Sequence, residues 1–330
     1  MAKEDKSVWV LFFEGIKIYA LNIHKFFLYM AFPVLGQLLG LFMIFGITYW
    51  YTQNFQNLIV KYPAMNDIST MLICIILSVI PGLLIWARAF WDYLVSYGAL
   101  NSMTDGYLNT GRVYDFRAHN SVVSKKVFSY IALWLLFSVF TLVSLIPLFW
   151  IIGFIFFIYF ILIFQVFTFE NGLSPVGYFR RSLQLVKGRF ARTFLLMILL
   201  VVFTYYLLTS GLSVIFDALN LTAKLAKVFE SWAYSLPVEH FERFGITPIV
   251  IGKEVVNQII FFIVVGFTLP LRSICWTLWY NNLASDSEDY EERRPKKKAS
   301  KKVTAKTFKI EKRGIDPEII RRARLEDDEY

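Results

Sequence analysis

The sequence predicts an all-α fold, a polytopic transmembrane helical bundle of about six spans, from three observations. Its 330 residues are 57% hydrophobic and only 18% charged, whereas soluble domains carry about 25% charged residues. Several uncharged runs are long enough to cross a bilayer, which takes about 20 apolar residues in a helix. Polar or amphipathic segments lead into these runs at three places, in a similar pattern each time.

The first of these segments is predicted to lie along the membrane surface. Over residues 7–27, the polar residues share one arc of a helix and apolar residues cover the rest. Lys17 and Lys25 are the cations of this arc. The pattern is typical of an interfacial helix. A helix packed on other parts of the protein is the alternative.

Six spans are expected, at about 27–51, 68–90, 127–145, 148–169, 193–216 and 254–276. In the first span, Gly36 and Gly40 have the small-residue spacing that lets two helices approach closely. The uncharged run from residue 127 to 169 is too long for one span. Pro147 stands near its middle and is expected to divide it in two.

Three charged residues near span ends are candidate polar sites, either within the membrane or at its interface. Arg88 and Asp92 are four positions apart and therefore share a helix face. The helical rise places Arg88 near the far interface, where its side chain would snorkel; an intramembrane ion pair is the alternative. Arg272 stands near the end of the sixth span, and Trp276, Trp279 and Tyr280 are expected to form the interfacial belt of that span.

A basic amphipathic helix is predicted to lead into the fifth span. Ser174 suits its N-cap and Pro175 its first position. On an uninterrupted helix, the basic residues that follow share one broad arc. They are Arg180, Arg181, Lys187, Arg189 and Arg192. Together with Lys17 and Lys25, they are the candidate residues for binding lipid headgroups.

The distribution of Lys and Arg predicts the orientation of the chain. Before the charged tail at 286–330, these residues concentrate ahead of the first span, between the second and third, and between the fourth and fifth. Such an excess marks the cytoplasmic side, so both termini are expected there. The tail mixes basic and acidic residues and is expected to be largely disordered. Its near-balanced charge disfavours nucleic acid and leaves a membrane or cytoplasmic protein as its expected partner.

An internal three-fold repeat of an interfacial helix followed by a transmembrane hairpin is also predicted, over 7–101, 115–169 and 174–283. GIKIYALNIHKFFLYM in the first copy and SLQLVKGRFARTFLLM in the third place charges and aromatic residues comparably. The segments that begin at Arg88 and Arg272 match more loosely. The middle copy is the weakest.

SPVGYFRRSLQLVKGRF followed by a span, with PLRSICWTLWYNNL closing the membrane part, resembles a bacterial family. It is the six-span membrane domain attached to some glycerophosphodiester phosphodiesterases, with stand-alone YciC-like inner-membrane relatives. The resemblance covers residues 7–283 and implies a bacterial inner-membrane location. In that family the chemistry belongs to a separate soluble domain. The 286–330 segment is too short for such a domain, so the resemblance implies no enzymatic activity here.

No catalytic, metal or cofactor site is predicted. His24, His119 and His240 are far apart in the sequence, and no Gly-rich phosphate loop is present. Cys74 and Cys275 are expected to be buried apolar residues. We therefore expect a non-enzymatic bundle that interacts with the bilayer, chiefly with anionic lipids, or serves as an accessory or scaffold. A small-molecule or lipid transporter or channel, with its path between the repeats, is the alternative.

Overall fold

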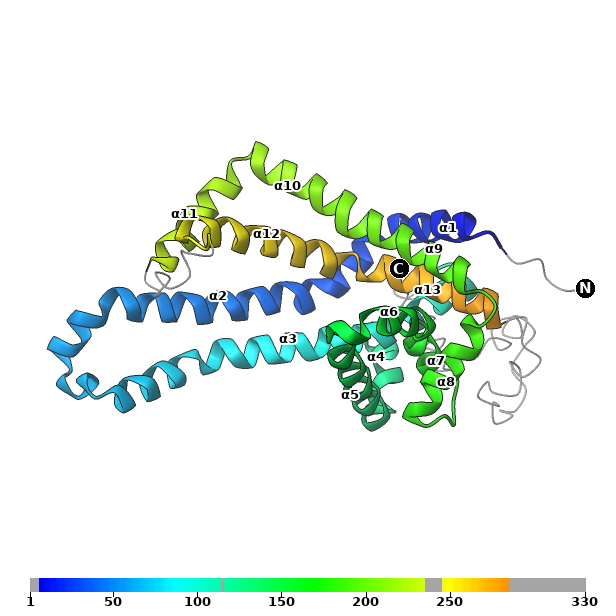
Figure 1. Ribbon diagram of the computed structural model, residues 1–330, viewed down its shortest axis with the longest axis horizontal. Helices are drawn as coiled ribbons and strands as arrows, with labels where there is room; N and C mark the ends of the chain where they lie inside the picture. Colours follow the sequence, from blue (N-terminus) through cyan, green and yellow to red (C-terminus); the bar gives the residue numbers. More distant parts are fainter. Residues whose placement is uncertain (1–5, 114–115, 235–244, 285–330) are drawn as a thin grey trace, which may run out of the picture. The chain divides into compact units, whose positions relative to one another are not determined.

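A computed structural model describes residues 6–113, 116–234 and 245–284, and these contain helices but no β-strand (Figure 1). The predicted tail lies outside them. In chain order, the helices are α1 (Val8–Leu21), α2 (Ile23–Lys61), η1 (Pro63–Asn66), α3 (Ile68–Thr110), α4 (Phe116–Ser124), α5 (Val127–Ser144), η2 (Pro147–Phe149), α6 (Trp150–Tyr159), α7 (Ile163–Phe169), α8 (Pro175–Val186), α9 (Phe190–Val201), the π-helix η3 (Val202–Leu207), α10 (Leu208–Ala218), α11 (Leu221–Ala233), α12 (Pro248–Phe267) and α13 (Leu269–Ala284).

Within the described residues, six helical segments are long and apolar enough to cross a membrane, which confirms the predicted class of fold. They are Ile23–Lys61, Ile68–Thr110, Val127–Ser144, Pro147–Phe169, Phe190–Ala218 and Pro248–Phe267. The first two contain 39 and 43 residues, about twice the length that the hydrocarbon core requires. They therefore extend well beyond the predicted spans 27–51 and 68–90.

The prediction for the sixth span is wrong in its last part. α12 ends at Phe267, and the Thr268 hydroxyl donates to the Val264 carbonyl at 2.6 Å. α13 then begins as a separate helix with Pro270 in its first turn, where proline is tolerated. Trp276 is half-buried. Trp279 and Tyr280 are fully buried in protein rather than forming an interfacial belt. The Trp279 indole N–H donates to the Thr193 hydroxyl, and the Tyr280 hydroxyl donates to the Glu170 carboxylate, each at 3.0 Å.

The described chain divides into two compact units. Unit 1 comprises the described parts of 1–26, 94–200 and 269–330, and unit 2 comprises those of 27–93 and 201–268. Each unit is therefore built from segments that are far apart in the sequence. Two unit boundaries fall inside the long helices α2 and α3.

In unit 2, α2 and α3 run side by side, and glycines bring them together (Figure 1). A Cβ atom on Gly36 would lie 2.9 Å from the Ala89 Cβ, and one on Gly40 would lie 2.7 Å from the Gly82 carbonyl oxygen. This is the close approach that the Gly36–Gly40 spacing predicts. Further along the pair, the Tyr51 and Ser78 hydroxyls hydrogen-bond at 3.1 Å.

The same unit contains a tightly packed pair formed by α11 and α12. A Cβ atom on Gly252 would lie 2.5 Å from the Ala226 carbonyl oxygen. Ala226 and Phe229 from α11 form an apolar cluster with Val256 and Ile260 from α12. The Phe45 ring of α2 packs on this cluster, 5.0 Å from the Phe229 ring.

Unit 1 contains the leading helices of the three predicted repeats, and each packs on the closing helix of the preceding repeat. We call this cyclic set of contacts the ring. α1 packs on α13, where a Cβ atom on Gly15 would meet the Cys275 sulfur. α4 lies on the end of α3, with Val123 against Gly98. α8 packs on α6 and α7. This cyclic order supports the repeat.

The ring uses equivalent sequence positions for these contacts. Gly15, His119 and Ser182 each precede the first residue of the following helix by eight positions, those helices being α2, α5 and α9. Each of the three contacts the preceding repeat. The predicted equivalence of Arg88 and Arg272 is not supported, because Arg88 belongs to unit 2 and Arg272 to unit 1.

The Ser182 side chain also compensates for an interruption between α6 and α7, in the second half of the uncharged run 127–169. α6 ends at Tyr159 and α7 begins at Ile163, which interrupts the helical hydrogen bonds. The Ser182 hydroxyl donates to the Tyr159 carbonyl at 2.7 Å and accepts from the Leu162 N–H at 3.3 Å. A side chain from α8 therefore satisfies backbone groups that would be costly to leave unpaired in an apolar region.

Candidate functional site

The basic segment that leads into the fifth span is two helices and not one. Ser174 caps α8 as predicted, its hydroxyl accepting from the Gly177 N–H at 3.1 Å. α8 then ends at Val186, and Gly188 turns the chain with φ +83°. Glycine adopts this left-handed conformation without a Cβ penalty. The predicted single arc of five basic residues is therefore wrong, because Arg189 and Arg192 lie beyond the turn.

Arg181 is a structural residue and not part of a headgroup surface. Its Nε–H donates to the Glu170 oxygens Oε1 and Oε2 at 3.0 and 3.2 Å, and the side chains are only 7% and 3% exposed. The Tyr280 hydroxyl donates to the same carboxylate at 3.0 Å. This buried cluster connects α8 and α13 to Glu170, the residue that follows α7. The prediction for Arg181 is wrong because Glu170 removes its charge from the surface.

The other predicted headgroup residues differ in exposure. Lys17, Arg180, Lys187 and Arg192 are exposed and Arg189 is half-buried. Lys25 is half-buried and its ammonium donates to the Val113 carbonyl at 2.8 Å.

Lys126 was not among the candidates and makes a similar contact. Its ammonium donates to the Phe167 carbonyl at 3.3 Å and lies over the Phe167 ring, 5.4 Å from the centroid. Burial lowers the pKa of this group. Lys25 and Lys126 therefore each donate a hydrogen bond to a backbone carbonyl of another segment. This leaves each ammonium fewer N–H groups to donate to a lipid headgroup.

Positive charge is concentrated in unit 1. The carboxylates in its described part are Glu14, Asp105 and Glu170; Glu14 pairs with Lys6 at 2.9 Å and the other two are buried. By sequence, its cations within the described ranges are Lys6, Lys17, Lys25, Arg112, Arg117, Lys125, Lys126, Arg180, Arg181, Lys187, Arg189, Arg192 and Arg272. Cations therefore greatly outnumber carboxylates in this unit.

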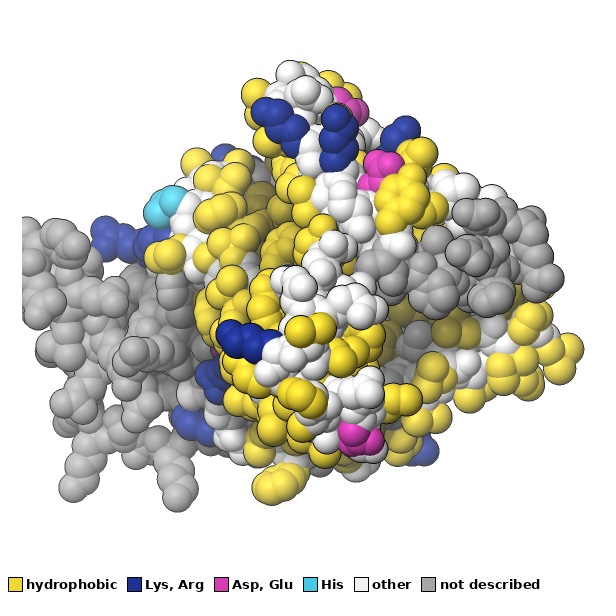
Figure 2. Space-filling model, turned by 90° about the vertical axis from the view of Figure 1, so that its left-hand side faces the viewer, with side chains coloured by type: hydrophobic (Ala, Val, Ile, Leu, Met, Phe, Trp, Pro, Cys, Tyr) yellow, Lys and Arg dark blue, Asp and Glu magenta, His cyan; other side chains and the backbone are white. Residues whose placement is uncertain are grey.

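Unit 2 is balanced by contrast. Its described cations are Lys61, Arg88, Lys224, Lys227 and Lys253, and its described carboxylates are Asp67, Asp92, Asp217, Glu230 and Glu254. Figure 2 views the molecule from the end where α2 and α3 are joined; apolar side chains cover much of this face, with both cations and carboxylates among them.

Arg88 and Asp92, which their spacing places on one helix face, form an ion pair in unit 2. The Arg88 guanidinium lies 3.2 Å from the Asp92 carboxylate, and the side chains are 67% and 26% exposed. Arg272 is half-buried in α13 and belongs to the other unit.

Sequence reasoning missed a buried polar centre where the closing helices of the three repeats meet. The Asn101 side-chain oxygen on α3 accepts from Gln165 on α7 at 3.1 Å, and from Ser273 and Thr277 on α13 at 2.6 and 3.4 Å. The Asn101 amide donates to Thr168 at 3.3 Å. These polar residues stand in largely apolar stretches of three helices, and this was the signal available in the sequence.

A buried Ser–His pair was also missed. The Ser102 hydroxyl lies 3.0 Å from His119 Nδ1, and His119 is fully buried between α3 and α4. Such a pair can activate a nucleophile. Here the equivalent positions of the other repeats carry Gly15 and Ser182, which pack on the preceding repeat, so a packing role for His119 explains the pair. Within the described residues, no three His, Cys, Asp or Glu side chains gather into a group that could hold a metal ion.

No family model, no curated protein and no solved structure matches this chain. The resemblance to the phosphodiesterase-associated membrane domain therefore stays a prediction. The assignment to helical membrane proteins rests on the six membrane-capable helices.

A transport path would need polar side chains within the spans, such as Gln165 in unit 1 and Gln258 in unit 2. Gln165 is buried and its amide donates to Asn101. The flanking rings of Phe164 and Phe167 lie 6.2 and 5.0 Å from the Tyr130 ring. In unit 2, Gln258 is exposed and donates to Glu254 on its own helix at 2.6 Å. Aromatic packing around Gln165 weighs against a path there.

Replacing Asn101 with leucine is expected to destabilise the protein by about 1–2 kcal/mol, because it removes the acceptor shared by Gln165, Ser273 and Thr277. Unfolding of the full chain in detergent micelles, followed by circular dichroism, measures the change. The control Gln258→Leu removes an exposed amide bonded only within α12 and should have little effect. Equal losses in the two variants would contradict a special role for Asn101.

Proposed function

We propose that this chain is a non-enzymatic, multi-pass protein of the cell (inner) membrane that binds anionic lipid headgroups through the exposed cations of unit 1. The observation that carries the proposal is the excess of cations over carboxylates in that unit, beside a balanced unit 2. Each Lys or Arg near an anionic membrane surface contributes about 1 kcal/mol to binding. Arg180, Lys187 and Arg192 are the principal residues, with Lys17 and Arg189 adding to them.

The two sides of α1 support the same function. Leu11, Gly15 and Ile18 are buried on the side that packs in unit 1. Trp9 and Phe13 on another side are 50% and 60% exposed. Large exposed apolar side chains next to Lys17 suit a helix at the boundary between headgroups and acyl chains. α1 therefore combines the two alternatives drawn from the sequence, protein packing on one side and the membrane surface on the other.

The orientation follows from the same charges. Segments rich in Lys and Arg remain in the cytoplasm during membrane insertion, and unit 1 contains the three segments that lead into the repeats. Both termini would then be cytoplasmic. The 286–330 tail would meet either the same anionic surface or a protein partner, which would make the bundle an accessory or scaffold for that partner.

The test compares anionic and neutral lipid binding by the full chain. Wild type and the variant Arg180→Gln/Lys187→Gln/Arg192→Gln are reconstituted with spin-labelled phosphatidylglycerol or phosphatidylcholine, and electron spin resonance gives the preference for each lipid. We expect the triple variant to lose at least tenfold in its preference for phosphatidylglycerol, and high salt to weaken the preference of wild type.

Lys224→Gln/Lys227→Gln/Lys253→Gln is the matched control, because it removes the same charge from exposed lysines of unit 2. It should leave the preference unchanged. Equal losses in the two triple variants, or a wild type that does not distinguish the lipids, would refute the proposal.

Lipid or small-molecule transport is a second candidate, favoured by one observation. The break between α6 and α7 makes a discontinuous helix within the membrane-capable segment Pro147–Phe169, and transporters use such helices to build binding sites. A dithionite assay with fluorescent phosphatidylcholine in proteoliposomes tests lipid movement. Bleaching of only the outer leaflet would exclude lipid scrambling.

A further inference from the structure

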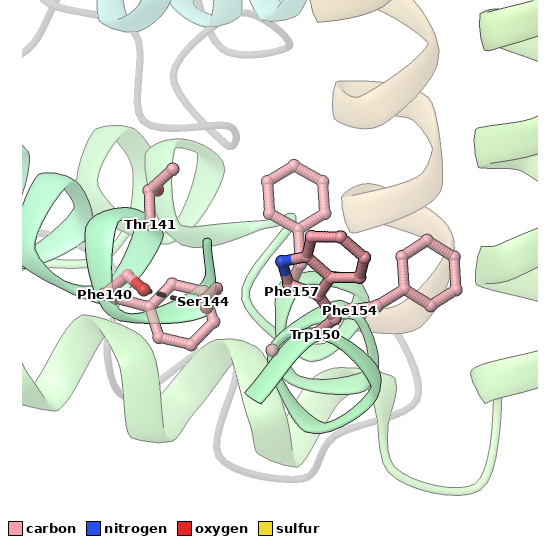
Figure 3. A pocket seen from close by; sticks show the side chains of 7 residues that line it. Phe140, Thr141, Ser144, Trp150, Phe154 and Phe157 are labelled. Atoms are coloured by element: carbon pink, nitrogen blue, oxygen red, sulfur yellow. Dashed lines mark hydrogen bonds between the residues drawn. The ribbon is translucent and has the colours of Figure 1, made fainter. Parts of the chain in front are cut away.

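The α5–α6 hairpin contains an apolar pocket with a volume of about 200 Å³. Phe140, Thr141 and Ser144 line it from α5, and Trp150, Gly153, Phe154 and Phe157 line it from α6. Figure 3 shows the aromatic side chains of α6 on one side of the space and the α5 residues on the other. All of these residues belong to unit 1.

The two helices approach each other closely beside the pocket. A Cβ atom on Gly153 would lie 2.5 Å from both the Cβ and the hydroxyl oxygen of Ser144. The absence of a side chain at Gly153 therefore permits the contact. Large rings flank this contact, and Phe154 and Phe157 are held by edge-to-face and tilted packing on Phe194 and Phe137.

The polar groups of the pocket are already satisfied within the hairpin. The Ser144 hydroxyl donates to the Phe140 carbonyl and the Thr141 hydroxyl to the Phe137 carbonyl, each at 2.8 Å. The Trp150 indole N–H donates to the Leu145 carbonyl at 2.7 Å. A ligand would therefore meet hydrocarbon and aromatic surface, without a donor or acceptor waiting for a partner.

The residues around the pocket indicate which kind of molecule it would bind. No charged residue occurs between 127 and 169, and both arms of the hairpin are membrane-capable. Next to the pocket, Leu148 and Ile151 are 81% and 77% exposed, which suits contact with hydrocarbon and not with water. Apolar cavities of about 150 Å³ hold a benzene molecule, so this pocket has room for a short stretch of alkyl chain but not for a drug-sized molecule.

We propose that the α5–α6 pocket holds part of the alkyl chain of a membrane lipid. Because lipid tails are as apolar as the pocket, binding would depend on close packing against the rings and not on the hydrophobic effect. The site is independent of headgroup binding by the cations of unit 1. The two proposals can fail independently, because headgroup binding depends on the charge of the lipid and pocket binding depends on contact with its alkyl chain.

The test is photo-crosslinking of the full chain in nanodiscs that contain phosphatidylcholine with a diazirine on one acyl chain. Mass spectrometry locates the adducts. We expect at least fivefold more adducts on Phe154 and Phe157 than on Val139, which is exposed on α5 outside the pocket. Thr141→Trp, which fills the pocket, should reduce adducts on the two rings at least fivefold and leave other sites unchanged.

Val139→Trp is the matched control, because it adds the same ring to the same helix outside the pocket, and it should keep the wild-type pattern. If Thr141→Trp lowers the melting temperature, the smaller Thr141→Leu should still reduce the adducts by about half. Adducts spread evenly over the hairpin would overturn the proposal. So would crosslinks at the pocket to a second copy of the chain, or an equal loss in both tryptophan variants.

Discussion

Replacing Arg181 with alanine is expected to lower the free energy of unfolding by about 3–5 kcal/mol, the cost of leaving a buried charge without its partner. The Glu170 carboxylate is 3% exposed and would lose a guanidinium that lies 3.0 Å away. The effect should extend to α13, because Tyr280 donates to the same carboxylate. Chemical unfolding of the full chain in micelles, followed by circular dichroism, measures the loss.

The neighbouring residue supplies the control. Arg180 is exposed on the same helix, and Arg180→Ala should change stability by no more than about 0.5 kcal/mol. Removing both charges, with Arg181→Met and Glu170→Gln together, should recover much of the loss in Arg181→Ala. Arg180→Ala and Arg181→Ala with the same stability would show that the buried pair does not hold α8 in place.

The membrane spans could be predicted because charge is excluded from hydrocarbon and its absence is visible in a sequence. The boundaries of α5 and of the segment from Pro147 to Phe169 follow closely from the uncharged run between 127 and 169 and from the proline inside it. α13 could not be distinguished in this way. An apolar stretch that faces lipid and one that faces a protein core have the same composition, and Trp279 suits either environment.

The roles of Arg180 and Arg181 show a second limit of sequence reasoning. The two residues are adjacent, equally basic and both on α8, yet only Arg181 turns toward Glu170. That carboxylate lies eleven positions earlier, across the turn between α7 and α8. The turn at Gly188 was similarly hidden, since a Lys-Gly-Arg sequence is compatible with a weakened helix as well as with a left-handed turn.

The sequence showed the repeat in the leading segments, but it did not show how these segments pack on one another's repeats. Two of the three copies share charge and aromatic placement, which is enough to align Ile23 with Phe190 at the start of α2 and α9. That each leading helix packs on the preceding repeat depends on contacts between distant residues, such as Gly15 with Cys275. The same ring brings Asn101 to its partners on α7 and α13. A polar centre of this kind belongs to the assembled ring and not to any one segment.

Replacing Gly40 with leucine is expected to destabilise the α2–α3 pair by about 3 kcal/mol. A Cβ atom there would lie 2.7 Å from the Gly82 carbonyl oxygen, and equally close to the Trp86 backbone nitrogen. Because these are backbone atoms, no change of rotamer can relieve the overlap, and the two helices must separate. Unfolding of the full chain in micelles, with tryptophan fluorescence as the signal, measures the effect.

Gly46 provides a control on the same helix, because a Cβ atom there has no heavy atom within 4 Å. Gly46→Leu should be neutral or slightly stabilising, since glycine is a poor helix former. Gly36→Leu should fall between the two, because its nearest neighbour is the Ala89 side chain and not backbone. The order Gly40, Gly36, Gly46 follows directly from the register of α2 on α3. Any other order would contradict the register in which Gly40 meets Gly82 and Gly36 meets Ala89.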